Sequence, residues 1–360
     1  MTVVTAIGPP IAPDVVDVVA LGESMVTFLP SRPGRLADVP SFERAIGGAE
    51  SNVACMLAAA GHSARWVGRL GADGFGDHLV ESIGAYGVDV GFVRRDPGRP
   101  TGIYFRTAGD RATDAHEVAY YRVGSAASAM AVGNTDLEAV WAGRVLHLSG
   151  ITAALSGGCL DLVRELTAPR PGRPLVSFDV NHRPGLWRSA DGPRVLLELA
   201  RGADIVFVGD DEAREAWGLH GARAIREALP EPEIVVVKQG RGGATALDKD
   251  TDGMCEDATG TATFVPALHV DVMAAVGAGD AFAAGFLSAT LRGLPVRDRL
   301  RHGHLMAAAA LTVPGDLAAP PARDHADRLA ALDDAGWGTL RLGPGWTEAD
   351  TRAVEEVRTP

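Results

Sequence analysis

The sequence predicts an α/β protein with a doubly wound, mainly parallel sheet, helices on both faces and a small antiparallel β lid. Two observations predict this fold. Four apolar runs start at intervals of 30, 30 and 29 residues, the spacing of a strand, a crossover helix and a parallel return strand. The N-terminal third instead contains short extended segments between polar stretches, a pattern typical of antiparallel strands.

The core strands are predicted from runs of branched apolar residues. They are expected over residues 17–22, 145–148, 175–178, 205–208 and 234–237. Helix-like stretches such as 159–166 and 194–199 lie between them. Ligands of such sheets bind beyond the carboxyl ends of the strands. Asp179, Gly209 and Lys238 follow three of these runs, so we expect them near a binding site.

The lid is predicted from two pairs of extended segments, within residues 24–46 and 99–124. A lid over an α/β cleft excludes water during group transfer. The alternative is a β-meander that is packed only as structure. We expect the main domain to span residues 14–334, with a flexible N-terminus over 1–13. Glycines and a proline in residues 335–360 predict a C-terminal extension that forms a surface tail.

The composition excludes several classes of protein. Acidic residues number 46 against 34 Lys plus Arg, a formal net charge of −12, whereas binding nucleic-acid phosphates needs a positive field. The sequence has no charge-free apolar run of membrane-spanning length and no basic start of a signal peptide. Its three cysteines lack metal-ligand spacing and fit a reducing compartment. We therefore expect a cytoplasmic protein that binds neither nucleic acid nor membrane.

The strongest chemical signal is the segment Gly277-Ala278-Gly279-Asp280, which precedes a run of small residues. The glycines permit a tight backbone, and the small residues begin a helix. N–H groups at a helix N-terminus form an anion site, and the carboxylate of Asp280 at that end can accept a proton. Both are needed for phosphoryl transfer to a hydroxyl. The alternative is that Asp280 only caps the helix.

Two other glycine-containing segments are candidates for ligand contact. Residues 238–243 follow a core strand and could hold phosphate or adenosine; they lack the Gly-Lys-Ser/Thr of a P-loop, and an ordinary turn is the alternative. Residues 47–52 carry glycines that let a ligand approach the backbone. Asn52 could bond sugar hydroxyls or stabilise the turn. Glu50 is interpreted as a partner of the helix dipole.

Two arginines, Arg122 and Arg183, fall in the lid and beyond a core strand. Arginine binds carboxylate or phosphate through paired hydrogen bonds, so these residues could hold an anionic substrate in an acidic protein. A surface salt bridge is the alternative for each. His182 is interpreted as a packing or orienting residue. Lys238 also stands out, because the only other lysine is Lys249.

Taken together, these motifs resemble the PfkB (ribokinase-like) carbohydrate kinases from about residue 17 to residue 334. Three segments carry the resemblance, in the order and at the separation typical of the family: residues 47–52, 67–76 and 276–285. Within the family the chain is similar to the 2-keto-3-deoxygluconate kinases. The local matches are at residues 22–23, 48–50, 120–126, 147–152 and 179–187.

The resemblance implies a ribokinase-like fold and assigns roles to residues of this chain. Asp280 would be the base, with the transferred phosphate over Gly277, Ala278 and Gly279. The implied substrate contacts are Gly48, Tyr104, Tyr120, Arg122 and Arg183, and Asn52 joins them as a candidate from its place on the first helical turn. The implied ATP contacts are Asn181, Lys238, Gly240 and Gly243.

Two departures from the family pattern concern metal ions. Many relatives carry Asp where this chain has Ala274, at a monovalent-cation site, so K⁺ activation is doubtful. Relatives often show Asn-x-x-Glu near Mg²⁺. Here residues 209–212 read Gly-Asp-Asp-Glu, so only Glu212 carries over, with contact to Mg²⁺ through water.

The leading hypothesis is an ATP- and Mg²⁺-dependent kinase that phosphorylates the terminal hydroxyl of 2-keto-3-deoxygluconate or a related sugar acid. The first alternative is a kinase for fructose, ribose or a nucleoside. The second alternative is a catalytically silent sugar or nucleotide sensor. The third is a nicotinamide dehydrogenase, which is disfavoured because no Gly-x-Gly-x-x-Gly motif follows the first predicted strand. The apolar faces of the lid also predict a homo-oligomer that pairs through it.

Overall fold

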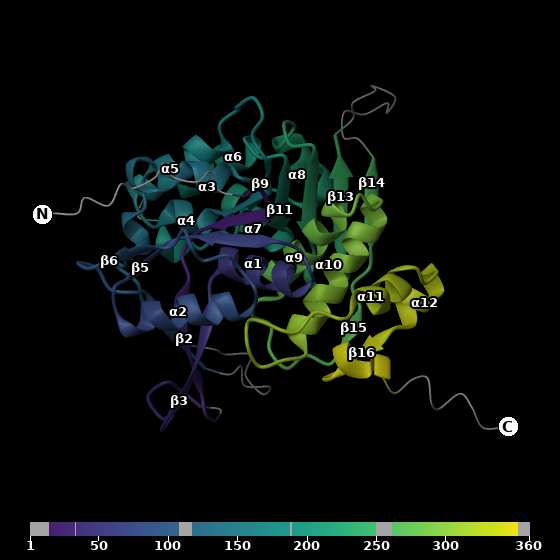
Figure 1. Ribbon diagram of the computed structural model, residues 1–360. Coiled ribbons are helices and arrows are strands. Elements are labelled where there is room, and N and C mark those ends of the chain that lie inside the picture. The colour runs from purple at the N-terminus through teal and green to yellow at the C-terminus, as the bar shows by residue number, and fades with distance from the viewer. Residues whose placement is uncertain (1–13, 33, 108–116, 188, 250–260, 352–360) are drawn as a thin grey trace, which may run out of the picture.

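The computed structural model describes residues 14–32, 34–107, 117–187, 189–249 and 261–351. Its centre is an eight-stranded sheet in the order β14-β13-β12-β11-β10-β9-β1-β4, parallel from β12 to β4 and antiparallel at β13 and β14 (Figure 1). The strands are β1 (Val16–Leu21), β4 (Ala64–Val67), β9 (Gly143–Ser149), β10 (Leu175–Asp179), β11 (Ile205–Gly209), β12 (Ile234–Lys238), β13 (Ala244–Asp248) and β14 (Ala262–Val265). The expected doubly wound, mainly parallel sheet is confirmed.

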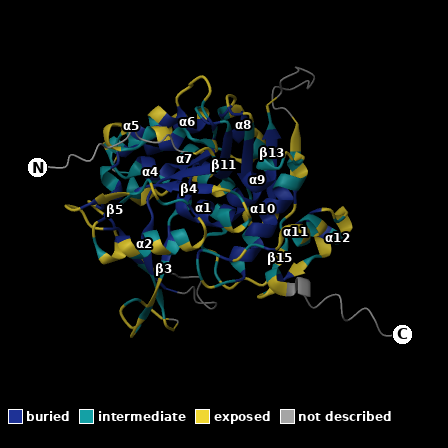
Figure 2. Ribbon diagram, in the orientation of Figure 1, coloured by how far each residue is buried: buried dark blue, intermediate teal, exposed yellow. Residues whose placement is uncertain are grey.

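Helices cover both faces of this sheet because its strands are apolar on both sides. One buried cluster joins Val18 and Phe207 to α1, α9 and α10; the opposite one joins Val19 and Phe178 to α3 and α5–α8. Figure 2 shows the central strands with α9 and α10 as the buried middle of the molecule. The helices are α1 (Ala49–Ala59), α2 (Gly74–Ala85), α3 (Leu137–Trp141), α4 (Gly150–Ala154), α5 (Gly157–Thr167), α6 (Gly192–Arg201), α7 (Asp210–Trp217), α8 (Gly221–Ala228), α9 (Ala278–Leu291), α10 (Val296–Leu311), α11 (Arg323–Ala330) and α12 (Asp334–Thr339).

The lid is a separate four-stranded sheet in the order β3-β2-β7-β8, which extends from the main body (Figure 1). Its strands are β2 (Met25–Pro30), β3 (Phe42–Gly47), β7 (Ile103–Arg106) and β8 (Val118–Tyr121). The outer pairs are antiparallel, as expected, whereas β2 and β7 run parallel. A parallel pair needs a long connection, and α1, β4, β5 (Arg69–Gly71), α2 and β6 (Arg94–Asp96) form it.

The C-terminal segment corrects one expectation. Residues 335–348 are not a surface tail, because Trp337 is 1% exposed and belongs to the core cluster of α9 and α10, with its ring centre 4.7 Å from the Arg301 guanidinium. The Trp337 indole N–H donates to the Pro266 carbonyl at 3.0 Å. β16 (Arg341–Leu342) pairs with β15 (His269–Val270), just before the segment that leads into α9. The surface-tail prediction rested on the glycines of this segment and gave no weight to its two tryptophans. Both tryptophans, Trp337 and Trp346, are buried. Residues 1–13 and 352–360 lie outside the described residues.

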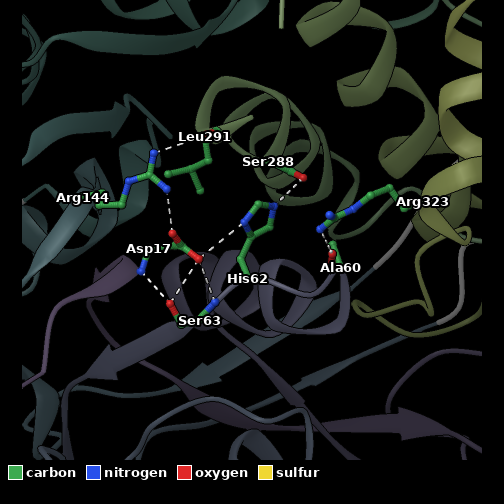
Figure 3. A network of polar contacts seen from close by, with 8 residues as sticks. All are labelled: Asp17, Ala60, His62, Ser63, Arg144, Ser288, Leu291 and Arg323. Atoms are coloured by element: carbon green, nitrogen blue, oxygen red, sulfur yellow. Dashed lines mark hydrogen bonds and ion pairs between the residues drawn. The ribbon is translucent and has the colours of Figure 1, made fainter. Parts of the chain in front are cut away.

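A polar network anchors α9 at the end away from Asp280 (Figure 3). The His62 ring Nε2 and the Ser288 hydroxyl of α9 are 2.8 Å apart. Arg144 donates to both the Asp17 carboxylate, at 2.9 Å, and the Leu291 carbonyl at the end of α9. These contacts tie α9 to the amino ends of β1 and β9, and so fix the position of the helix whose other end carries the candidate site.

Candidate active site

The N-terminus of α9 presents free backbone N–H groups. Gly277 has a φ of 79°, which favours glycine, and a Cβ there would clash with the Asp316 carbonyl. The helical hydrogen bonds begin with the Ala281 N–H, which donates to the Gly277 carbonyl at 2.9 Å. The N–H groups before it have no partner within the helix. This positive helix end suits an anion such as a phosphoryl group.

Asp280 lies in the first turn of α9 and is half-buried. The Asn52 side-chain amide of α1 donates to its Oδ2 at 2.8 Å. Burial raises the pKa of Asp280 to about 7; the Asn52 hydrogen bond opposes the rise, and the charge of Asp179 adds to it. A carboxylate with this pKa is suited to accept a proton near neutral pH. Since its bond goes to Asn52 and the α9 N-cap has no side-chain bond, the capping alternative loses support.

Lys238 places a positive charge beside this helix end. Its ammonium group donates to both Asp179 carboxylate oxygens, at 2.9 and 3.2 Å. A Cβ on Gly279 would lie 3.6 Å from Lys238 Nζ, so the ammonium group is next to the anion site. Burial alone would lower the pKa of Lys238, but the carboxylates of Asp179 and Glu212 raise it, and the group stays charged. Lys238, one of the two lysines of the chain, is therefore a compact cation whose charge is suited to an anion at this helix end.

Glu50 is a second carboxyl group near Asp280, and it is fully buried. The Thr152 hydroxyl donates to its Oε1 at 2.6 Å, and Oε2 has no partner among the described residues. Burial raises the pKa of Glu50 to about 8, and the charge of Asp280 contributes. Burial therefore favours the protonated form of Glu50, which weakens the interaction of its charge with the α1 dipole, although the residue does lie in the first turn of α1.

The lid residues form a connected group. The rings of Tyr104 and Tyr120 lie 5.4 Å apart, and the Arg122 guanidinium is 5.7 Å from the Tyr120 ring centre. Arg122 is 8% exposed and forms an ion pair with Glu23, which also accepts from the Ser125 hydroxyl at 2.6 Å. The Arg122 charge is thus already compensated within the protein.

Two further candidate residues, Asn181 and Glu212, lie just beyond the carboxyl ends of β10 and β11. Asn181 has a left-handed φ of 39°, and its buried Oδ1 has no partner among the described residues. Glu212 accepts the Gly209 N–H at 2.8 Å and lies 3.8 Å from Arg183, whose side chain is 54% exposed. No described group of three His, Cys, Asp or Glu side chains could hold a metal alone. One amide oxygen and one carboxylate fit a Mg²⁺ that is held mostly by phosphates and water.

At several of the predicted contact positions, the local backbone or a close neighbour requires glycine. A Cβ on Gly48 would clash with the Glu23 carbonyl, so the start of α1 can approach the β1–β2 turn only with glycine there. Gly240 and Gly243 lie in the turn after Lys238 with φ values of 54° and 134°. A Cβ on Gly243 would clash with the Val265 carbonyl of β14. This turn requires glycine even without a ligand.

Sequence reasoning did not assign roles to several polar residues that the structure brings to the site. Asp179 was expected near it, but not as the partner of Lys238. Glu23, Thr152 and Asp316 were given no role. Their position after the carboxyl ends of β1 and β9 could have indicated Glu23 and Thr152. No sequence pattern indicates Asp316, because it lies in the loop after α10.

A groove of about 910 Å³ runs along the lid, and the candidate sugar contacts Tyr120 and Arg122 are part of its lining. Its lining includes Phe75, Ile103, Tyr121 and Val123, and the Tyr121 and Val123 side chains are exposed. Phe28 and Phe105 stack beside it at 4.7 Å. Ile103 lies on the face of β7 opposite Tyr104 and Asp316, whereas Tyr120 packs against Tyr104, so the groove is lined from both faces of the lid.

Comparisons with known proteins place the chain among carbohydrate kinases. The pfkB family of carbohydrate kinases matches residues 16–323. The 2-dehydro-3-deoxygluconokinase of Bacillus subtilis is 32% identical over 86% of this chain and 93% of its own length. Probable fructokinase-6 of Arabidopsis thaliana is 30% identical over 82% of this chain and 77% of its own. The structure of a sugar kinase from Pyrococcus horikoshii in complex with ATP superposes with a TM-score of 0.73 at 24% identity, over 86% of this chain and 96% of that one.

Proposed function

Because the chain belongs to the pfkB family of carbohydrate kinases, we propose that it transfers the γ-phosphoryl group of ATP to the terminal hydroxyl of 2-keto-3-deoxygluconate or a related sugar acid. The observation that carries the kinase chemistry is Asp280, held by Asn52 at the free N-terminus of α9 and close to Lys238. The dehydrogenase alternative is overturned by the family match, which covers residues 16–323.

Different site residues would perform different parts of the phosphoryl transfer. Asp280 takes the proton of the acceptor hydroxyl, and the α9 N–H groups with Lys238 hold the charge that develops on the phosphoryl oxygens. Asn181 and Glu212 would hold Mg²⁺, which neutralises phosphate charge when bound. The unpartnered Asn181 Oδ1 supports this assignment. Asn181, Lys238, Gly240 and Gly243 are the proposed ATP contacts.

For the sugar acid, Arg183 is the stronger candidate of the two arginines. Its side chain is half exposed and 3.8 Å from its nearest carboxylate, so it can still bind an anion. Arg122 is buried against Glu23, and a substrate carboxylate would have to share it. Gly48, Asn52, Tyr104 and Tyr120 remain proposed contacts of the sugar hydroxyls.

A screen of phosphoryl acceptors tests the substrate, followed by the variant Arg183→Met. A charge-assisted hydrogen bond is worth roughly 1.5–3 kcal/mol, so kcat/KM for the sugar acid should fall about ten- to a hundredfold. The same variant should hardly change kcat/KM for fructose, which has no carboxylate. Arg194→Met is the matched control, since Arg194 is an exposed arginine of α6. An equal loss on both substrates would mean that Arg183 serves ATP or folding.

The fructokinase relative keeps a neutral sugar as the second candidate substrate, and the compensated charge of Arg122 favours it. If fructose, ribose or a nucleoside is the better acceptor, the sugar-acid proposal fails. A sensor is distinguished by ATP consumption: a silent protein would consume no ATP with any acceptor.

We further propose that the kinase domain lies in the cytoplasm, begins near residue 14 and extends beyond the expected limit of 334 to include the buried Trp337 and Trp346, and that two copies pair through the outer face of the lid. Cys55 and Cys159 are free and buried, which fits a reducing compartment. Within the described residues no helix is long and apolar enough to cross a membrane. Light scattering of Val123→Arg tests the pairing, and a smaller particle than the unmodified protein is expected.

A further inference from the structure

A buried polar cluster lies between the lid and α9, and none of the roles above uses it as a unit. The Tyr104 hydroxyl donates to Asp316 Oδ2 at 2.9 Å, and Arg106 donates to Asp316 Oδ1 at 2.8 Å. Arg106 also donates to the Pro314 carbonyl at 3.2 Å. The three side chains are 5–6% exposed. A buried ion pair with added hydrogen bonds fixes geometry more than it stabilises a fold.

The backbone of Asp316 is in direct contact with the anion site. The closest atoms to a Cβ built on Gly277 are the carbonyl oxygen, carbonyl carbon and Cα of Asp316. Gly277 is the N-cap of α9, immediately before the free N–H groups. A displacement of Asp316 would therefore move the residue that begins the anion site.

The other side of the cluster belongs to the lid. Tyr104 and Arg106 are alternate residues of β7, so they point to the same face. The Tyr104 ring packs against Tyr120, a proposed sugar contact. A Cβ on Gly47 would clash with the Tyr104 hydroxyl, so the end of β3 leaves room for this contact. Packed groups thus run without a gap from the lid to the phosphate site.

We propose that Asp316 is a positioning residue that couples lid strand β7 to the N-terminus of α9, so that sugar binding under the lid sets the anion site. The inference rests on the kinase activity and not on the identity of the sugar. Binding energy of the correct substrate can assemble a catalytic site in this way. A small misplacement of reacting groups costs about a hundredfold in rate, so the coupling should appear in kcat.

A double-mutant cycle tests the proposal with Tyr104→Phe, Asp316→Ala and their combination, using the best acceptor found in the screen. Tyr104→Phe removes one hydroxyl and should lower kcat about ten- to a hundredfold, with the KM for ATP nearly unchanged. In the Asp316→Ala background the same change should have little further effect. Tyr86→Phe is the matched control, because Tyr86 ends α2 and lies outside the cluster.

The pH profile of kcat adds a second measurement, which would not change if Asp316 only contributed to the stability of the fold. Asp280 is faced by charged or titratable groups at Asp179, Lys238, Glu50 and Asp316. The charge of Asp316 raises the pKa of Asp280, so Asp316→Asn should shift the acidic limb of kcat to lower pH. This variant also keeps the test informative if Asp316→Ala does not fold.

Two results would overturn the coupling: additive losses in kcat for Tyr104→Phe and Asp316→Ala, or an effect of Asp316→Asn on melting temperature alone. Failure of the sugar-acid proposal is a separate result, since it appears in the unmodified protein as poor use of 2-keto-3-deoxygluconate. The cycle is then measured with the acceptor that is used.

Discussion

Asp280 and Glu50 are two carboxyl groups with different surroundings. Asp280 is half-buried, accepts a hydrogen bond from Asn52 and has a pKa of about 7. Glu50 has no exposure and a pKa of about 8, because burial outweighs its bond from Thr152. Burial favours the protonated form of both groups, and more strongly for the fully buried Glu50. A neutral Glu50 repels an incoming phosphate less than a second carboxylate would.

Replacing Asp280 tests its role as base. Asp280→Asn keeps the size of the side chain and the α9 N–H groups, so the variant should fold and bind ATP. General-base catalysis is typically worth about 10²–10⁴-fold, and kcat should fall by that factor. ATP binding by calorimetry and steady-state turnover are the two measurements. Near-normal turnover would show that Asp280 is only structural.

The pH dependence of kcat should report the same group. Protonated Asp280 cannot accept a proton, so kcat should rise with pH through about 7. The Asn52 hydrogen bond lowers the pKa of Asp280, and Asn52→Ala should therefore move this limb to higher pH. If the pH midpoint of kcat is unchanged in Asn52→Ala, the rise in kcat does not report the titration of Asp280.

At the scale of elements, we expect the loop before α9 to decide the response to monovalent cations, because the family resemblance implies a cation site there. The Met273 N–H donates to the Leu311 carbonyl at 2.8 Å, so backbone contacts join this loop to the end of α10. Ala274 brings no carboxylate. The nearest acidic candidate, Asp271, has its carboxylate beside Gly343, where a Cβ would lie 3.1 Å away, on the side of β16.

Activity should therefore be nearly indifferent to replacing K⁺ with Na⁺ or a bulky organic cation at fixed ionic strength. The reason is that a methyl group at Ala274 cannot ligate a cation. Turnover in the three salts checks this, with Ala274→Asp beside it as the variant that restores a carboxylate. Strong K⁺ activation of the unmodified protein would show that another group supplies the ligand.

At the scale of the whole molecule, histidines are buried as neutral groups between sheet and helices. Burial lowers the pKa of both His147 and His304 to about 4. The His304 Nε2–H donates to the Val265 carbonyl at 3.2 Å, so its neutral form is built into the packing of α10 on β14. The unfolded chain, with a histidine pKa of about 6.5, binds protons that the folded chain excludes.

His304→Gln should make the protein less sensitive to acid. Stability from the neutral histidine is present above pH 6.5 and is lost as the pH falls toward 4, because the unfolded state binds more protons there. The slope is at most about 1.4 kcal/mol per pH unit. Urea unfolding at several pH values should show the variant losing less free energy of unfolding than the parent. His220→Gln, at an exposed histidine, should leave the pH dependence unchanged.

The sequence by itself determined the alternation of strands and helices and the segment at residues 277–280. Both are local properties: apolar runs of regular spacing dictate parallel strands, and two glycines before a small-residue run dictate a helix start that exposes N–H groups. The predicted core strands accordingly lie within a residue or two of β1 and β9–β12.

Only the tertiary structure decided which groups meet. Asn52 and Asp280 are 228 residues apart in the chain, and Tyr104 and Asp316 are 212 apart. The ion pair of Arg122, the raised pKa of Glu50 and the burial of Trp337 likewise depend on neighbours from distant segments. Pairing and desolvation are properties of a packed interior, and a pattern along one chain does not contain them.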